Sequence, residues 1–244
     1  MRCAGRPASW SDVDLQPGFH ALWPTPLAVR RHGDAEALNT LLVRVFGALR
    51  VTQSHARGVA PGAFFVSDDD LLQRVQLPEW QGFLRFVVER LRDTVTQANT
   101  GVWPHGVGLQ VQIEGMWFQF SNRGAFHDVH THGNCSWSGV YCVQVDPEPL
   151  RVLHPVYGAA NGATRFYGPP FAQLGGAHVD LGNAYLQPPH VDVAPEPGQL
   201  MLFPSWLAHQ ALPYDGERDR LVVSFNASIH AAHGGDRLHG YSAA

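Results

Sequence analysis

Apolar side chains recur at three- and four-residue steps in the first part of the chain, and this spacing predicts amphipathic helices. Residues 34–51, DAEALNTLLVRVFGALRV, place leucine, valine and phenylalanine along one helical face. A second such helix is expected over residues 77–97, with Pro78 near its start. Between them, SDDDLLQRV over residues 67–75 predicts a short helix capped by Ser67.

The pattern changes near residue 108 to short segments typical of strands. These segments, residues 109–120, 138–145, 199–203 and 220–226, are rich in β-branched and aromatic residues and are bounded by turn residues. Strands without helices between them favour an antiparallel sandwich or barrel. Residues 147–197, rich in proline and glycine, are expected to form long loops on it.

These patterns predict three regions within one structural domain. An N-terminal helical region over residues 1–107 is expected to pack on a β core over residues 108–230. Residues 231–244 are expected to form a C-terminal tail. The total of 244 residues is sufficient for one sizeable core.

Composition narrows the possible partners. The net charge is -4 and no basic run is present, which argues against a nucleic-acid partner. No apolar stretch is long enough to cross a membrane, and the N-terminus lacks a signal-peptide pattern. The cysteines, Cys3, Cys135 and Cys142, have no CxxC spacing, which favours reduced thiols in the cytoplasm. The oligomeric state stays open.

A histidine cluster, FHDVHTH over residues 126–132, immediately precedes a predicted strand. In extended backbone, alternation would put Asp128, His130 and His132 on one face and His127 on the other. Two imidazoles two residues apart can hold one metal ion. However, the chain has 14 histidines, so roughly one HxH pair is expected by chance and the motif alone is weak.

A later segment makes a metal site more plausible. The stretch GQLMLFPSWLAHQ ends near His209, and in a jelly roll such a late histidine lies close to the strand with the early HxH. Arg220 opens the following strand and is expected deeper in the barrel. A buried guanidinium is costly without an acid, and a ligand could supply that acid. The chain has no lysine, so arginine or neutral donors must meet any bound carboxylate.

The motifs HxH, SGVYCV, GQLMLFPSWLAHQ and RLVVSFN, in this order, resemble the 2-oxoglutarate/Fe(II)-dependent oxygenase superfamily. They are most similar to a bacterial branch with the pattern H-x-H, SGVYYV, FPSW-x-x-H and R-x-SFN. The resemblance implies a mainly β (α+β) double-stranded β-helix, or jelly roll, with N-terminal helices packed on it. It also implies Fe(II), 2-oxoglutarate and O2, used for C–H hydroxylation of a small organic, amino-acid or peptidyl substrate.

By the same resemblance, His130 and His209 would bind iron, and Arg220 would bind the distal carboxylate of 2-oxoglutarate. Further co-substrate contacts would come from Tyr141, and with less support from Gln119, Ser224 and Asn226. The usual carboxylate ligand of the superfamily is replaced here by His132. Three imidazoles could therefore hold the iron. Alternatively, His132 stays off the metal, or Asp128 supplies the carboxylate.

Two other functions fit the same residues. A three-histidine metal cupin that does not use 2-oxoglutarate would need Arg220 in a structural ion pair with Asp215, Glu217 or Asp219. A non-catalytic barrel with a structural zinc ion would need a fourth ligand. Asp128 is the only obvious candidate for that ligand.

Overall fold

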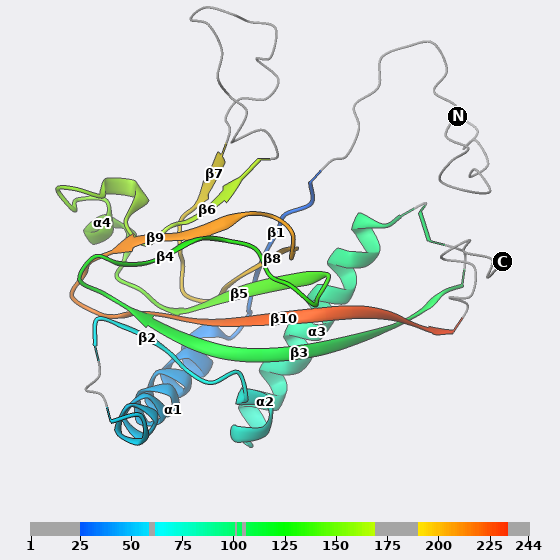
Figure 1. The fold of residues 1–244 in the computed structure, drawn as a ribbon, viewed down its shortest axis with the longest axis horizontal. Coiled ribbons are helices and arrows are strands. Elements are labelled where there is room, and N and C mark those ends of the chain that lie inside the picture. The colour runs from blue at the N-terminus through cyan, green and yellow to red at the C-terminus, as the bar shows by residue number, and fades with distance from the viewer. Residues whose placement is uncertain (1–24, 59–61, 101, 104–105, 169–189, 234–244) are drawn as a thin grey trace, which may run out of the picture.

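Two antiparallel β-sheets face each other in the computed structural model, which describes residues 25–58, 62–100, 102–103, 106–168 and 190–233 (Figure 1). The larger sheet has the strand order β1 (Ala28–Arg31), β8 (Gln199–Pro204), β5 (Trp137–Gln144), β10 (Arg220–His233), β3 (Gly108–Ser121) and β2 (Phe64–Val66). The smaller sheet has the order β4 (Ala125–His130), β9 (His209–Tyr214), β6 (Thr164–Tyr167) and β7 (His190–Val193). This arrangement confirms the predicted mainly β jelly roll.

Helices α1 (Ala35–Ala56) and α3 (Pro78–Ala98) cover the outer face of the larger sheet (Figure 1). The two predicted helices are thereby confirmed, and Pro78 begins α3. Their apolar faces bury against the sheet. The ring of Phe46 on α1 stacks on that of Phe118 on β3, with the ring centroids 4.7 Å apart. The rings of Phe46 and of Trp80 on α3 pack edge to face, with centroids 5.9 Å apart. The main core therefore lies between helices and sheet, which leaves the other face of the sheet for the cavity.

Two local expectations are corrected by the structure. Helix α2 (Leu71–Arg74) begins after Asp70 and is not capped by Ser67. The Ser67 hydroxyl instead donates a hydrogen bond to the main-chain oxygen of Asp68 and accepts one from the N–H of Phe118. These bonds link the residues before α2 to β3. The stretch expected to form loops, residues 147–197, also holds α4 (Glu148–Arg151), a 3-10 turn (Gly158–Ala160), β6 and β7.

The N-terminal region contributes strands as well as helices. β1 pairs with β8 at one edge of the larger sheet, and β2 pairs with β3 at the other edge. At the opposite end of the sequence, β10 continues to His233, three residues past the expected boundary at residue 230. Within the described ranges, none of the helices is long and apolar enough to cross a membrane.

Candidate metal centre

A cavity of about 430 Å³, counted to its open mouth, lies between the two sheets. Strands of both sheets and the connection after β4 contribute its walls. The lining residues are His127, His130, His132, Thr164, His209 and Ala211 on one side, and Trp117, Gln119, Gly139, Val140, Arg220, Val222, Ser224 and Phe225 on the other. No acidic side chain is among these described lining residues, so neutral imidazoles and one guanidinium dominate the polar surface.

Three of the cavity histidines form a group that could hold one metal ion. The ligand nitrogens of His130, His132 and His209 all lie within 4.8 Å of one another. The Nε2 atoms of His132 and His209 are 3.3 Å apart. Metal–nitrogen bonds of about 2.0–2.1 Å place two imidazole nitrogens on one ion roughly 3 to 3.5 Å apart. The separation therefore suits a shared ion.

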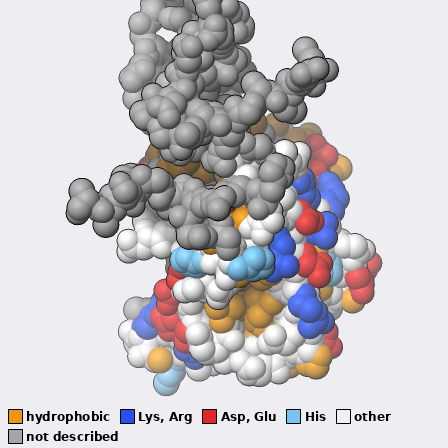
Figure 2. Space-filling model, turned by 90° about the vertical axis from the view of Figure 1, so that its right-hand side faces the viewer, with side chains coloured by type: hydrophobic (Ala, Val, Ile, Leu, Met, Phe, Trp, Pro, Cys, Tyr) orange, Lys and Arg blue, Asp and Glu red, His pale blue; other side chains and the backbone are white. Residues whose placement is uncertain are grey.

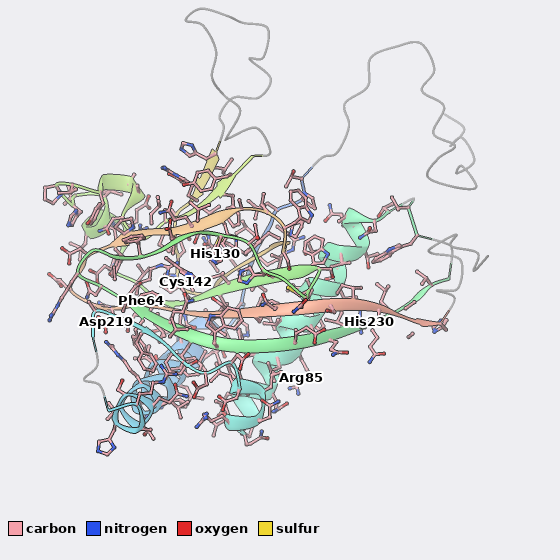
Figure 3. All side chains as sticks on the ribbon, in the orientation of Figure 1. Phe64, Arg85, His130, Cys142, Asp219 and His230 are labelled. Atoms are coloured by element: carbon pink, nitrogen blue, oxygen red, sulfur yellow. The ribbon has the colours of Figure 1, made fainter. Side chains whose placement is uncertain are left out.

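Main-chain pairing brings these three residues together. β4 and β9 run antiparallel, with His130 directly opposite His209. The N–H of His132 donates to the main-chain oxygen of Ser205 at 2.9 Å, which holds the connection after β4 beside the turn before β9. Figure 3 shows His130 in the space between the two sheets. The site is thus built on paired backbone, which fixes its geometry.

Hydrogen bonds to backbone oxygens also fix two ring tautomers. The Nδ1 atom of His130 donates to the main-chain oxygen of Asp128 at 2.6 Å. The Nδ1 atom of His209 donates to the main-chain oxygen of Leu207 at 2.9 Å. Because Nδ1 carries the proton in a neutral ring of this kind, Nε2 keeps its lone pair for a metal.

The electrostatic setting keeps two of the imidazoles, those of His132 and His209, neutral. Burial, together with neighbouring imidazoles, lowers the pKa of His132 to about 4. Burial likewise lowers the pKa of His209 to about 3, with the nearby histidines adding to the effect. Neutral imidazole is the form that binds metals, so near neutral pH protons do not compete for these two ligands.

Arg220 lies in the same cavity without an anionic partner. Its side chain is buried, with 4% of the residue exposed, and its Nε atom has no hydrogen-bond partner. No ion pair to Arg220 occurs in the described part of the chain, and burial lowers the pKa of its guanidinium. A buried cation that lacks an acid is costly, so this group is suited to a carboxylate ligand.

The expected alternation on β4 is wrong. His127 lines the cavity, whereas the side chain of Asp128 is exposed and accepts a hydrogen bond from the N–H of Val129. The reason is irregular pairing with β9, whose register shifts on both sides of His127. The two-residue alternation is therefore interrupted, and Asp128 does not reach the three-histidine group. The sequence carries no pattern from which this irregularity could be read.

The other co-substrate candidates fall on both sides of the larger sheet. Gln119 and Ser224 line the cavity as expected. Asn226 accepts a hydrogen bond from Ser138 and is not among the lining residues. Tyr141 lies on the opposite face of β5, fully buried, where its hydroxyl donates to Asn39 of α1. The structure therefore removes Tyr141 from the co-substrate contacts.

Thr164 and Trp117 are among the cavity residues that were not expected from the sequence. Thr164 comes from the proline- and glycine-rich stretch, and Trp117 comes from β3. Trp117 has the same strand parity as Gln119, which could have indicated its side of the sheet. Thr164 lies in β6, a short strand that no sequence pattern indicated.

Figure 2 shows the face on the right-hand side of Figure 1, where histidine side chains border a hydrophobic patch. Arginine and acidic side chains lie beside that patch. The cavity thus combines three imidazoles that could hold a metal ion with a buried arginine whose Nε has no partner, a combination suited to a metal and a carboxylate ligand.

Comparison with known proteins agrees. Residues 115–226 match the model of a protein family described as "Putative 2OG-Fe(II) oxygenase". This stretch contains the three clustered histidines and Arg220. No curated protein matches the chain. Within residues 115–226 the chain therefore resembles 2-oxoglutarate/Fe(II)-dependent oxygenases, and its three clustered histidines could hold a metal ion.

Two solved structures of one protein, HygX, support the fold. HygX from Streptomyces hygroscopicus with nickel and 2-oxoglutarate bound has a TM-score of 0.53 at 12% identity, covering 84% of this chain and 82% of that chain. The iron-bound form of HygX has a TM-score of 0.50 at 11% identity, with the same coverage of 84% and 82%. A prolyl-4-hydroxylase from Pseudomonas putida has a TM-score of 0.47 at 16% identity, covering 84% of this chain and 93% of that chain.

Proposed function

We propose that this protein is an oxygenase that hydroxylates a C–H bond of a small organic, amino-acid or peptidyl substrate, with His130, His132 and His209 as the iron ligands. Arg220 is proposed to bind the distal carboxylate of 2-oxoglutarate, with Gln119 and Ser224 beside it. The observation that carries the proposal is the buried Arg220, whose Nε has no partner, in the same cavity as three clustered imidazoles.

Charge balance favours this combination. The three imidazoles are neutral ligands, so a ferrous ion and Arg220 would bring three positive charges into a cavity whose described walls have no acid. A dianionic co-substrate would supply two negative charges. The usual histidine–carboxylate set would have neutralised part of the metal charge within the protein itself.

The bound iron and 2-oxoglutarate supply the oxidation: O2 converts 2-oxoglutarate to succinate and CO2 while one oxygen atom enters the C–H bond. The protein residues orient the two groups and exclude water. Trp117, Val140 and Val222 give the cavity apolar walls, and Thr164 adds a neutral hydroxyl. This lining suits an uncharged, carbon-rich reacting group rather than an acidic one.

The two rival functions find less support in the geometry. In a cupin without 2-oxoglutarate, Arg220 would pair with a nearby acid. However, Asp219 binds Arg50 at 2.7 Å, Asp215 contacts His154 at 3.4 Å, and the ion pairs of the described residues include none for Glu217. A structural zinc site would need a fourth ligand, and the exposed Asp128 is turned away.

A reducing cytoplasmic location is proposed because Cys135 and Cys142 are both free thiols.

Replacing Arg220 with alanine tests the proposal. Under anaerobic conditions, adding 2-oxoglutarate to the Fe(II)-loaded protein should produce the visible charge-transfer band of a chelated 2-oxo acid. Loss of one partner of a buried charge pair costs about 2–5 kcal/mol. Arg220→Ala should therefore weaken 2-oxoglutarate binding by at least roughly 30-fold, with Fe(II) affinity unchanged.

Arg218→Ala is the matched control, because this arginine lies two residues away and 63% of its side chain is exposed. It should behave like the wild type. Equal loss of iron and 2-oxoglutarate binding in Arg220→Ala would contradict the assigned role. A wild-type protein that binds iron but gives no band would favour the cupin alternative.

A further inference from the structure

His127 is a cavity histidine outside the group proposed to bind iron. Its ring centroid lies 4.1 Å from that of His130 and 6.2 Å from that of Phe64 on β2. The side chain is half-buried and lines the cavity. Within the described part of the chain, its ring has no hydrogen-bond partner. A polar group that faces a cavity without a partner is available to a ligand.

Strand β9 shows how deep His127 lies in the cavity. His209 marks the level of the proposed iron ligands, and Ala211 lies two residues farther along, roughly 6–7 Å deeper. His127 pairs with Ala211 from one side and Thr164 pairs with it from the other. His127 and Thr164 therefore flank Ala211 at the same depth.

The aliphatic part of the Arg220 side chain lies deeper in the cavity than His127. A Cβ atom on Gly162 would be 3.4 Å from Cδ of Arg220. The N–H of Gly162 donates to the main-chain oxygen of Pro213, two residues beyond Ala211 on β9. Along the depth of the cavity, His127 therefore lies between the proposed iron ligands and the aliphatic part of the Arg220 side chain.

Ala211 leaves space at this level because its side chain is a single methyl group. A dicarboxylate that extends from the iron ligands to Arg220 must pass over Ala211, between His127 and Thr164. A neutral imidazole still has one N–H to donate, and hydrogen bonds to a carboxylate are among the strong ones.

We infer that His127 binds the distal carboxylate of 2-oxoglutarate together with Arg220. This inference rests on the proposed function, in which 2-oxoglutarate spans the cavity. It adds a co-substrate contact from the smaller sheet, whereas Arg220, Gln119 and Ser224 all come from the larger sheet.

Two variants and two oxo acids test the inference. His127→Leu removes the donor, and His127→Gln keeps an N–H donor on a side chain of similar reach. The probes are 2-oxoglutarate and 2-oxopentanoate, which has the same five-carbon chain but a methyl group in place of the distal carboxylate. Each probe is titrated anaerobically into Fe(II)-loaded protein while the visible band is followed. Fe(II) affinity is measured separately.

His127→Leu is expected to weaken 2-oxoglutarate binding about tenfold or more, the usual effect of losing a hydrogen bond to a charged group. Binding of 2-oxopentanoate and of Fe(II) should be unchanged. His127→Gln should recover part of the 2-oxoglutarate affinity. Asp128→Asn, an exposed neighbour on the same strand, is the control and should match the wild type.

Several results would overturn the inference. Equal weakening of both oxo acids would place His127 at the metal end of the co-substrate. Loss of Fe(II) affinity would make it a ligand, and wild-type affinity for 2-oxoglutarate in His127→Leu would leave it as a wall of the cavity. A wild-type protein that binds iron without any band would reject the proposed function itself and this inference with it.

Discussion

Burial controls the protonation of two of the histidines proposed to bind iron, His132 and His209. The pKa of His132 is about 4 and that of His209 about 3, whereas both would titrate near 6.5 in the unfolded chain. At a pH between the folded and the unfolded pKa values, the unfolded state binds more protons than the folded state. The free energy of unfolding of the metal-free protein should therefore fall as the pH decreases from 7.5 to 5.5.

Urea denaturation at the two pH values, with a chelator present, measures this effect. The window lies above the range in which carboxylates titrate, so histidines dominate it. In His209→Asn, which cannot take up a proton at this position, the pH dependence should be smaller. A metal-free protein equally stable at both pH values, with no difference in the variant, would contradict this account.

At the scale of residues, the sequence located the candidate ligands but not their surroundings. The HxH pair and the late His209 could be found because their order along the chain is informative. The inward position of His127 depends on shifted pairing between β4 and β9, which only the folded backbone reveals. Tyr141 was expected in the site from the resemblance alone, and alternation along β5 does not tell which face meets the helices, where its side chain lies.

At the scale of elements, the close packing of β5 requires a residue without a side chain at Gly139, because the ring of Phe225 lies against it. A Cβ atom on Gly139 would lie 2.4 Å from Cζ of Phe225 and 3.0 Å from Cδ2 of Leu202. Phe225 is fully buried and lies opposite Gly139 on β10. Gly139→Ala should therefore lower the free energy of unfolding by about 1–3 kcal/mol, as overpacking a core usually does.

Gly47→Ala is the matched control, because Gly47 lies within α1 and an added Cβ would have nothing within 4 Å. It should raise the free energy of unfolding by about 0.5–1 kcal/mol, since glycine is unfavourable inside a helix. Urea denaturation of both variants measures the difference. Changes of the same sign in the two variants would argue against close packing at Gly139.

Four strands of the larger sheet, β3, β5, β8 and β10, could be predicted because they have apolar or aromatic runs, whereas the short edge strands β1 and β2 were not predicted. The smaller sheet could not be predicted, since β6 and β7 have four residues each and are separated from β9 in the sequence. Such strands are specified by pairing with distant segments rather than by local pattern. The helices were clear because their apolar faces persist over many turns.

At the scale of the whole molecule, the helical layer binds the acid that precedes Arg220 in the sequence. Arg50 of α1 binds Asp219 at 2.7 Å, and the side-chain amide of Asn122 donates to the same carboxylate at 3.1 Å. Asp219 directly precedes Arg220, yet its charge is already engaged by the helix. The charge of this sequence neighbour is thus used by Arg50, which is consistent with a guanidinium of Arg220 that is left for a ligand.

Iron and 2-oxoglutarate should stabilise the entire fold, because the proposed ligands come from the smaller sheet and its connection while Arg220 comes from the larger. A ligand present at 100 times its dissociation constant stabilises the folded state by about 2.7 kcal/mol. For a protein of this size, that corresponds to a rise in melting temperature of roughly 5–10 °C.

Thermal unfolding measures this with metal alone, with metal and 2-oxoglutarate, and after chelation. Metal should raise the melting temperature, and 2-oxoglutarate should raise it further only while metal is present. Arg220→Ala should keep the first rise and lose the second, because its imidazoles are intact but the distal carboxylate has lost its cation. A second rise of wild-type size in that variant would mean that 2-oxoglutarate is held elsewhere. Arg220 would then remain a buried cation without an assigned anion.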